Sequence, residues 1–405
     1  MANRFPEVSP SLEATGFSVS VRAPMSAEQS ELPEAVIRRS PEDFVVEELP
    51  AYPASGKGEH LFITFRKRGL TTPDAVRALA RSLGVDPRFA GWAGMKDRHA
   101  VTTQTVSFSL PMARDAEAAA AKIAIPGLEV LAAARHDNKL KPGHLLGNRF
   151  TLILRGIDPA ELAAARAILE DAGRVGVPNA FGPQRFGRDG ANPERALAWL
   201  AGKERGPRDK RDQRMLFSAL QSLLFNEVLE KRVAAGTWST ALAGDIAKKH
   251  DSGGLFDVPL SGPELDDARA RADAGAITAT GPMYGAKMRW PAGEPLAIER
   301  AVLDASALDD ALLEARKSLG EGTRRALRLE VKEMAVTEEI VSPGGTKPAG
   351  PVGSAPGIVV RFVLPKGGYA TTVLGRAFRL RDAALEKPSD AELNNNEPDA
   401  EEEPG

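Results

Sequence analysis

The sequence predicts an α+β fold in which a helix-rich segment interrupts a strand-rich domain. Three observations lead to this prediction. Alternating apolar and polar residues, which are typical of strands, recur up to residue 154 and return after residue 328. Between these stretches, apolar residues recur at the spacing of amphipathic helices. Segments without periodicity lie at both ends of the chain. We therefore expect residues 34–176 and 326–381 to form one domain, with residues 177–325 inserted into it.

The first part of the chain contains predicted strands and two helices with clear start signals. In HLFITF, the side chains of Leu61, Ile63 and Phe65 share one face, which predicts a strand. Thr72 as N-cap and Pro73 in the first turn predict a helix through residue 83. We also expect strands at PEDFVVEEL (41–49), at Val106, Phe108 and Leu110, and at FTLIL (150–154). Residues 91–97 are expected to form a glycine-containing loop. A second helix is expected from the capping box at 158–161 to near Gly173.

The inserted segment is predicted to be mostly helical. A long helix at residues 211–233 is indicated by its leucine spacing and ends before Gly236. Shorter helices are expected after the Asn192–Pro193–Glu194 cap and at 263–274 and 305–319, and strands are expected again at 328–336 and 358–364.

The formal charge of −2 is an average over unlike parts of the chain. Residues 382–405 form an acidic tail of charge −8 and residues 1–33 carry −2, so residues 34–381 carry +8. Both ends lack periodicity, and we expect them to be disordered. Residues 342–357, SPGGTKPAGPVGSAPG, are expected to form a flexible loop. A basic body of this kind is compatible with a polyanionic partner.

Composition excludes several classes of protein. Without cysteine the chain has no disulfides, thiolate metal sites or cysteine nucleophile, and its five histidines show no HExxH spacing. No apolar stretch is long enough to cross a membrane and the N-terminus lacks a signal core, so we expect a cytoplasmic protein with no membrane partner. Because P-loop, dinucleotide and nucleophile-elbow motifs are missing, we expect no cofactor and no metal.

The densest polar cluster is GMKDRHAVTTQ, residues 94–104. It places Asp97 between Lys96 and Arg98, after a glycine-containing loop and before a predicted strand. Nearby positive charge favours the ionised form of a carboxylate, which suits a nucleophile or an electrostatic stabiliser. A surface turn with weak ion pairs explains the same residues, and on residue types alone it is the favoured interpretation.

Three other segments combine aromatic residues with amides, guanidinium groups or glycines, as RNA-binding sites do. They are NAFGPQRFG (179–187), GNRF (147–150) and GGYATT (367–372). Aromatic residues usually pack in cores, so each segment also has a structural interpretation. The run 203–214 holds six basic and three acidic residues, and it is either a solvated face or a surface that contacts phosphates.

Together these motifs resemble one family. PEDFVVEE, GKGEH, GMKDRHAVTTQ, GNRF, PNAFGPQRFG, LFSALQSLLFN and LPKGGYATTVL follow the order and rough spacing of the TruD-type tRNA pseudouridine synthases, across residues 34–381. The resemblance implies a mixed-sheet pseudouridine synthase catalytic domain interrupted by a helix-rich α/β TruD insertion domain. It also implies isomerisation of a uridine in tRNA, usually at tRNA position 13, without a cofactor and with Asp97 as the nucleophile.

The resemblance implies roles for further residues. Phe44 and Phe150 look like the family's substrate-contacting aromatic residues, and Asn148 looks like its base- or backbone-contacting amide. Tyr369 looks like a C-terminal aromatic contact, where phenylalanine is common. Phe150 cannot take a proton, so the acceptor of the C5 proton has no assignment.

Four charged residues complete the expected substrate contacts. Glu47 matches an acidic position near the family's site, and Lys96 and Arg98 flank the nucleophile. Arg38 stands where lysine is common, which keeps the charge and changes the geometry.

Two other functions remain open at this point. The first is a catalytically inactive RNA-binding or chaperone protein on the same fold. The second is a nucleoside hydrolase or glycosidase, whose chemistry usually needs two facing carboxylates, whereas Asp97 is the one strong candidate here. For the synthase we expect tRNA as the partner, no protein partner, and a monomer.

Overall fold

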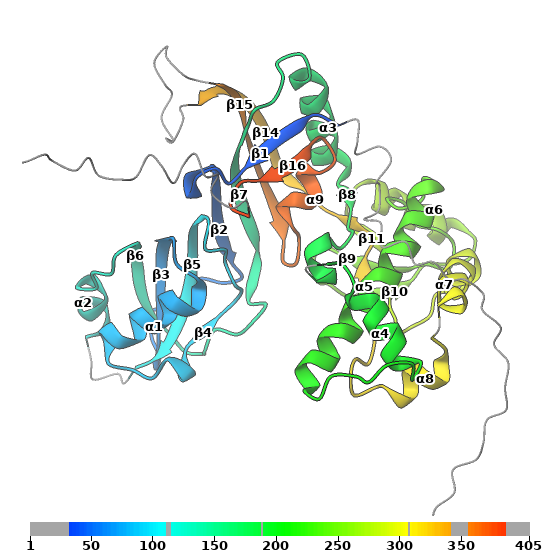
Figure 1. Ribbon diagram of the computed structural model, residues 1–405, viewed down its shortest axis with the longest axis horizontal. Coiled ribbons are helices and arrows are strands. Elements are labelled where there is room, and N and C mark those ends of the chain that lie inside the picture. The colour runs from blue at the N-terminus through cyan, green and yellow to red at the C-terminus, as the bar shows by residue number, and fades with distance from the viewer. Residues whose placement is uncertain (1–31, 111–114, 188, 307, 342–354, 386–405) are drawn as a thin grey trace, which may run out of the picture.

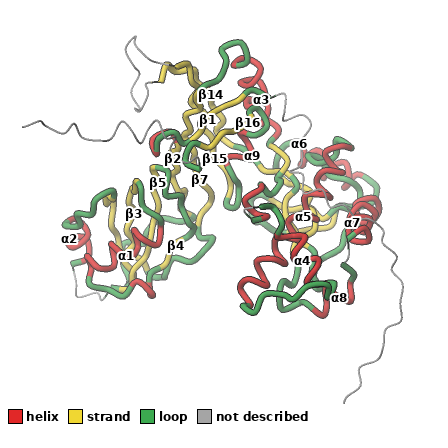
Figure 2. Tube along the Cα trace, viewed as in Figure 1, coloured by secondary structure: helices red, strands yellow, loops and turns green. Residues whose placement is uncertain are grey.

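A computed structural model describes residues 32–110, 115–187, 189–306, 308–341 and 355–385. Most of the segments that we expect to be disordered or flexible lie outside the described residues. Figure 1 shows a strand-rich part that runs from the lower left to the top and a helix-rich part at the right. Figure 2 shows the same division, with strands gathered along the first part and most helices in the second.

Ten strands form one mixed sheet in the described part of the chain. Its main order is β14-β15-β7-β2-β5-β3-β6, with β1 beside β7 and β16 and with β4 beside β5. The pairs β1–β16 and β2–β5 are parallel, whereas neighbours such as β7 and β15 are antiparallel. The predicted mixed-sheet α+β fold is therefore confirmed. The strands are β1 (Glu34–Ile37), β2 (Phe44–Pro50), β3 (His60–Arg68), β4 (Gly91–Trp92), β5 (Val101–Ser109), β6 (Leu128–His136), β7 (Leu145–Arg155), β14 (Lys332–Val341), β15 (Ala355–Pro365) and β16 (Arg379–Asp382).

Helices pack on this sheet over two separate cores. α1 (Thr72–Leu83) buries Val76 and Leu79 against the apolar residues of β3 and β5. α3 (Leu162–Val175) and α9 (Ala370–Leu374) bury Leu169 and Val373 with residues of β7 and β15. Full burial of each such side chain contributes about 1.5–3 kcal/mol. The short elements of this part are η2 (Pro41–Asp43), η3 (Pro87–Phe89) and α2 (Ala116–Ala121).

The chain enters and leaves the helix-rich part through two paired strands. β8 (Val177–Pro178) and β13 (Arg328–Leu329) are antiparallel neighbours, so the two crossings lie side by side. We call residues 34–176 and 326–381 the sheet domain and residues 177–325 the insertion. The insertion contains η4 (Pro183–Phe186), α4 (Asn192–Leu200), α5 (Lys210–Ala234), β9 (Ile246–Lys249), β10 (Leu255–Asp257), α6 (Pro263–Asp273), β11 (Ile277–Met283), α7 (Gly293–Ala305), α8 (Asp310–Ala315) and β12 (Thr323–Ala326). The last residue of β12, Ala326, is the first residue of the second sheet-domain segment.

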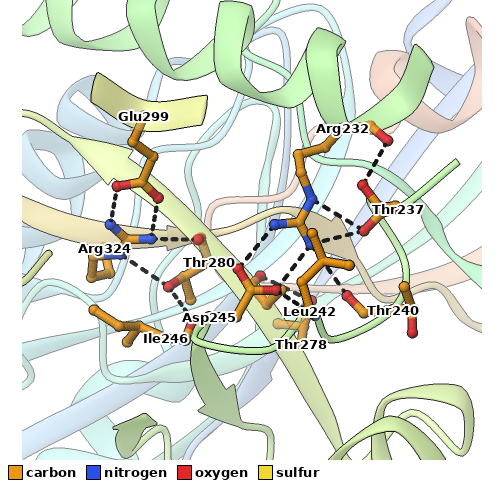
Figure 3. A network of polar contacts seen from close by, with 11 residues as sticks. Arg232, Thr237, Thr240, Leu242, Asp245, Ile246, Thr278, Thr280, Glu299 and Arg324 are labelled. Atoms are coloured by element: carbon orange, nitrogen blue, oxygen red, sulfur yellow. Dashed lines mark hydrogen bonds and ion pairs between the residues drawn. The ribbon is translucent and has the colours of Figure 1, made fainter. Parts of the chain in front are cut away.

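Two buried ion pairs hold the core of the insertion together (Figure 3). Arg324 on β12 donates to both carboxylate oxygens of Glu299 on α7, at 2.7 Å each. Arg232 on α5 donates to both oxygens of Asp245, at 2.9 and 3.0 Å. Threonine oxygens, including that of Thr280, accept further bonds. Because loss of one partner of such a pair costs about 3–5 kcal/mol, the network fixes the elements that carry it.

Two predicted helix starts are wrong in detail. The N-cap of α1 is Thr71, whose Oγ1 accepts a hydrogen bond from the backbone N of Asp74, and Thr72 is the first helical residue. The box at 158–161 forms a turn instead of a helix start, because Asp158 Oδ1 accepts from the nearby backbone N of Ala160. α3 therefore begins only at Leu162.

The predicted helix at 305–319 is wrong for most of its length. α7 ends at Ala305, and among the described residues 308–319 the helix α8 is limited to Asp310–Ala315, capped by the side chain of Asp309. α7 itself was not predicted. Three other predicted bounds are also wrong. Gly91–Trp92, which were expected in a loop, form a short strand, and residues 355–357, which were expected in the flexible loop, belong to β15. Asp382, which was expected in the acidic tail, ends β16.

Candidate active site

A cavity of about 490 Å³ lies between the sheet domain and the insertion. Four parts of the chain line it: Arg38, which follows β1; residues of β2 and β7 with the loop before β5; residues between 181 and 185 at the start of the insertion; and residues 368–371 at the start of α9. Seven of the nine residues predicted for the site line this cavity, namely Arg38, Phe44, Lys96, Asp97, Asn148, Phe150 and Tyr369. The structure thus brings together residues that are more than 300 positions apart in the sequence.

Asp97 lies on the loop between β4 and β5, and 61% of its side chain is exposed. Arg38 Nη1 approaches its Oδ2 at 3.5 Å, a long contact. The same guanidinium binds Asp382 more closely, with 2.8 Å between Nη2 and Oδ2. Arg38 also has a left-handed backbone, with φ of 56°, a conformation that costs a non-glycine residue about 1–3 kcal/mol. The arginine is therefore held firmly by Asp382 while it points at the exposed carboxylate of Asp97.

Lys96, the residue before Asp97, has its ammonium turned into the sheet domain. Its Nζ lies 2.9 Å from Glu48 Oε2, and 6% of the Lys96 side chain and 3% of the Glu48 side chain are exposed. Glu48 Oε1 also accepts from the backbone N of Thr105 on β5, at 3.3 Å. The ion pair therefore ties the loop to two strands, which favours a structural role for the Lys96 ammonium over direct substrate contact.

The floor of the cavity is aromatic. Phe44 and Phe150 meet edge to face, with 6.3 Å between ring centroids, and Phe150 stacks on Phe362 at 5.4 Å. Both lining rings are mostly buried in the core of the sheet domain. The guanidinium of Arg38 lies over the Phe44 ring, 4.8 Å from its centroid. These rings thus serve the core and present one surface to the cavity.

Asn148 places an unpaired acceptor in the wall. Its Oδ1 is buried, and in the described part of the chain it has no hydrogen-bond partner. An unpaired buried carbonyl costs about 1–3 kcal/mol. Asn148 lines the cavity, so a ligand that donates a hydrogen bond to this oxygen once the amide turns toward the cavity would remove that cost.

The insertion side of the cavity carries positive charge stacked on an aromatic ring. The guanidinium groups of Arg185 and Arg325 lie 5.5 and 4.0 Å from the centroid of the Phe181 ring. Arg185 donates to Ser218 and Ser222 of α5, the latter at 3.1 Å. Burial lowers the pKa of Arg325 to about 10. In the described residues Arg185 has no ion pair, so its charge faces the cavity uncompensated.

Two exposed apolar side chains stand at the cavity: Met95 is 63% exposed and Tyr369 is 40% exposed. The exposed ring of Tyr369 suits stacking on a nucleobase.

Two predicted contacts lie outside this lining. Glu47 is paired in register with Arg149 of β7, and Arg98 Nε donates to the backbone O of Gly69 at 3.0 Å. The neighbour of Glu47, Glu48, makes the buried contact with the loop instead. Sequence reasoning missed Glu48 and Met95. It found the segment of Arg185 without assigning that residue to the site.

The described residues offer neither a metal site nor a membrane span. Among them, no cluster of His, Asp and Glu could hold a metal ion. Within the same residues, no helix combines the length and apolarity needed to cross a membrane.

A solved structure shares this architecture. A crystal structure from Methanosarcina mazei, described as a tRNA pseudouridine synthase D (TruD), superposes with a TM-score of 0.70, covering 87% of this chain and 94% of that one, at 24% identity. That likeness shows the fold class, an α+β fold with a mixed sheet.

Sequence comparisons identify the family. The family model described as tRNA pseudouridine synthase D (TruD) matches residues 27–197 and 209–377. A relative of that name from Anaeromyxobacter sp. (strain Fw109-5) is 45% identical, covering 84% of this chain and 90% of the relative. Another, from Thermus thermophilus, is 38% identical, with 88% and 93% covered. The chain belongs to the tRNA pseudouridine synthase D family, as the motifs predicted.

Proposed function

We propose that Asp97 is the nucleophile with which this tRNA pseudouridine synthase isomerises uridine, at tRNA position 13. One observation carries the proposal: Asp97 is the only carboxylate among the described residues that line the cavity. Its side chain is exposed to that cavity, and a cation points at it. Arg185 also lines the cavity, and because its guanidinium has no ion pair among the described residues, its charge suits a phosphate of an RNA backbone.

The reaction requires little beyond one carboxylate and a cavity that admits the uridine. The target uridine leaves its stack to enter the cavity. Asp97 then attacks C1′ of the ribose or assists cleavage of the glycosidic bond, and both routes are open. The freed uracil rotates, C5 bonds to C1′, the C5 proton is lost and N1 gains a proton. Because product and substrate are isomers, neither water nor an external acceptor is consumed.

The other lining residues have roles that follow from their contacts. Arg38 orients the Asp97 carboxylate, and Phe44 and Phe150 form an apolar floor for the uracil ring. The unpaired Oδ1 of Asn148 can accept the uracil N3–H. Arg185 faces the cavity from the opposite side and suits a phosphate. We also propose a monomer as the active unit.

A hydrolase is less well supported. Glycosidic hydrolysis usually employs two carboxylates that flank one bond, and the described lining of the cavity contains one. A catalytically inactive RNA-binding protein is also less well supported, because the cavity holds an exposed carboxylate, Asp97, beside a cation.

The test uses unmodified tRNA without any added cofactor. Wild type is expected to create one new carbodiimide-dependent stop in primer extension, at position 13, and a U13C tRNA is expected to show none. Asp97→Asn should lose about 10⁴-fold or more in rate, as loss of a nucleophile does, while its tRNA affinity stays within about 3-fold. Asp304→Asn, an exposed carboxylate on α7 outside the lining, is the matched control.

Each outcome separates the alternatives. Activity retained in Asp97→Asn would overturn the assignment of the nucleophile. Free uracil in place of pseudouridine would support the hydrolase, and tRNA binding without any product would support the inactive protein.

A further inference from the structure

A buried lysine lies directly beneath the loop that carries Asp97. Lys67 on β3 is 1% exposed. Its Nζ donates to three backbone carbonyls: Leu70 at 2.8 Å, Asp97 at 2.7 Å and Lys96 at 3.4 Å. Three acceptors match the three protons of one ammonium group. In the described part of the chain no carboxylate pairs with it.

Its position on the strand is unusual for a charged residue. Leu61, Ile63 and Phe65, which precede it at alternate positions, are all fully buried. Lys67 continues the same face of β3, so a charged group occupies a position where the strand pattern favours an apolar one. Burial of an ammonium without a carboxylate is costly, and an apolar side chain there would favour folding. A role in the site gives a reason for a charge at this position.

The remaining anchors of the loop act on the same short stretch of backbone. The backbone N of Lys96 donates to Thr72 Oγ1 at 2.9 Å, and that hydroxyl donates to Gln104 Oε1, also at 2.9 Å. The Lys96 ammonium is held by Glu48. All of these contacts fix residues 96 and 97 from behind and leave the Asp97 carboxylate itself free.

We infer that Lys67 is a positioning residue for the reaction, because its ammonium clamps the consecutive carbonyls of Lys96 and Asp97 and so sets the direction of the nucleophilic side chain. The carboxylate has one long contact, to Arg38, and cannot be aimed by that contact alone. The direction of its Cα–Cβ bond therefore depends on the backbone. This inference rests on the proposed function of Asp97.

The clamp also predicts a pH dependence. Burial lowers the pKa of Lys67 to about 8, with nearby Asp97 raising it and Lys96 lowering it. Above that pH the neutral amine keeps two protons for three carbonyls, so the loop loosens. We expect kcat to fall above about pH 8 while the affinity for tRNA changes little.

The titration of Lys67 does not itself destabilise the fold in this pH range. The folded-state pKa of about 8 lies below the ordinary value of 10.5, so between these values the unfolded chain binds more protons than the folded one. The contribution of Lys67 to stability therefore rises with pH across this window. Any titration of the substrate is common to wild type and variants, and it cancels when their profiles are compared.

The experiment compares Lys67→Met with Arg66→Met in pseudouridine formation on tRNA. Arg66 is the exposed neighbour on β3, and its replacement removes the same charge without touching the loop. Lys67→Met should lower kcat by about 100-fold with KM within about 3-fold, because a misplacement of about 1 Å has an effect of that size. Arg66→Met should resemble wild type.

A kcat of Lys67→Met within about 3-fold of wild type overturns the inference, as does an equal loss in kcat and in tRNA affinity. If Lys67→Met does not fold, Thr72→Val and the pH profile of wild type decide the question. A fall of about 10-fold in kcat of folded Thr72→Val at constant KM supports the clamp, and a wild-type kcat that stays flat to about pH 9.5 overturns it. Asp97→Asn in the same assay separates the two proposals. If Asp97→Asn stays active, the proposed function fails. If Asp97→Asn is inactive and Lys67→Met has normal activity, the inference about Lys67 fails and the proposed function stands.

Discussion

The cavity has a sheet-domain wall, formed by its lining residues between 38 and 150, and an insertion wall, formed by its lining residues between 181 and 185. These two walls use their positive charges differently. On the sheet-domain wall each cation of the described lining is engaged: Lys96 pairs with Glu48, and Arg38 pairs with Asp382 and approaches Asp97. On the insertion wall, Arg185 is held by serine hydroxyls and an aromatic ring and keeps its charge uncompensated. Paired cations fix geometry, whereas a free guanidinium attracts an anion. We therefore expect the first wall to govern the chemical step and the second to govern RNA binding.

This difference also appears in what holds each wall in place. The sheet-domain wall is built on adjacent strands, where backbone ladders and the Lys96–Glu48 pair set positions directly. The insertion wall depends on the packing of segment 181–185 against α5, whose own position is fixed by buried ion pairs such as Arg232–Asp245 (Figure 3). Substitutions in the two walls should accordingly separate kcat from KM.

The largest expected effect is on the sheet-domain wall. Arg38→Ala removes a cation that points at Asp97 and takes away the guanidinium that binds Asp382. We expect kcat to fall about 100-fold, the size of effect produced by loss of one preorganised charge or donor in a site, with KM within about 3-fold. Single-turnover rates at saturating enzyme measure the chemical step directly.

Arg38→Lys is the matched variant for this prediction. It keeps the charge, loses the fork geometry of the guanidinium, and should retain activity to within about 10-fold. If Arg38→Ala instead raised KM and left kcat unchanged, the sheet-domain wall would share the binding role and the distinction between the walls would fail.

A smaller effect is expected on the insertion wall. Arg185→Gln keeps a polar side chain next to Ser222 and removes the charge that faces the cavity. We expect the Kd for tRNA to rise about 10-fold, and the slope of log K against log salt to fall by about one, as for loss of a single phosphate contact. Fluorescence anisotropy over a salt series measures both quantities.

Arg269→Gln provides the control, because this residue lies on α6 of the same insertion, outside the lining, and changes the net charge equally. An unchanged salt slope in Arg185→Gln, together with a lower kcat, would reverse the roles assigned to the two walls.

The sequence could reveal the parts of the site that are contiguous in the chain. Asp97 stood out because GMKDRHAVTTQ is dense in polar residues, and the family resemblance then pointed to Phe44, Asn148 and Tyr369. Lys67 and Glu48 were missed because their partners, Asp97 and Lys96, lie 30 and 48 positions away.

A signal for one of them was nevertheless present in the sequence. Lys67 falls on the apolar face of the strand that begins HLFITF, and a charge at such a position indicates a buried contact without naming its partner. Helix boundaries failed for a different reason. At 158–161 the same Asp side chain can cap a turn or a helix, and tertiary packing selects between them.

The smallest expected effect concerns the residue that lies on neither wall. Tyr369 stands on the turn before α9, 40% exposed, where its ring can stack on the base. Tyr369→Phe keeps that ring and should change kcat and KM by less than about 3-fold, whereas Tyr369→Ala should weaken binding by about 1 kcal/mol or more through lost stacking. The pair of variants separates the ring from the hydroxyl. A fall of kcat in Tyr369→Phe by more than about 10-fold would mean that the phenol takes part in proton transfer. In that case the turn before α9 would join the sheet-domain wall in the chemical step, and Tyr369 would become the acceptor for the C5 proton that Phe150 cannot take.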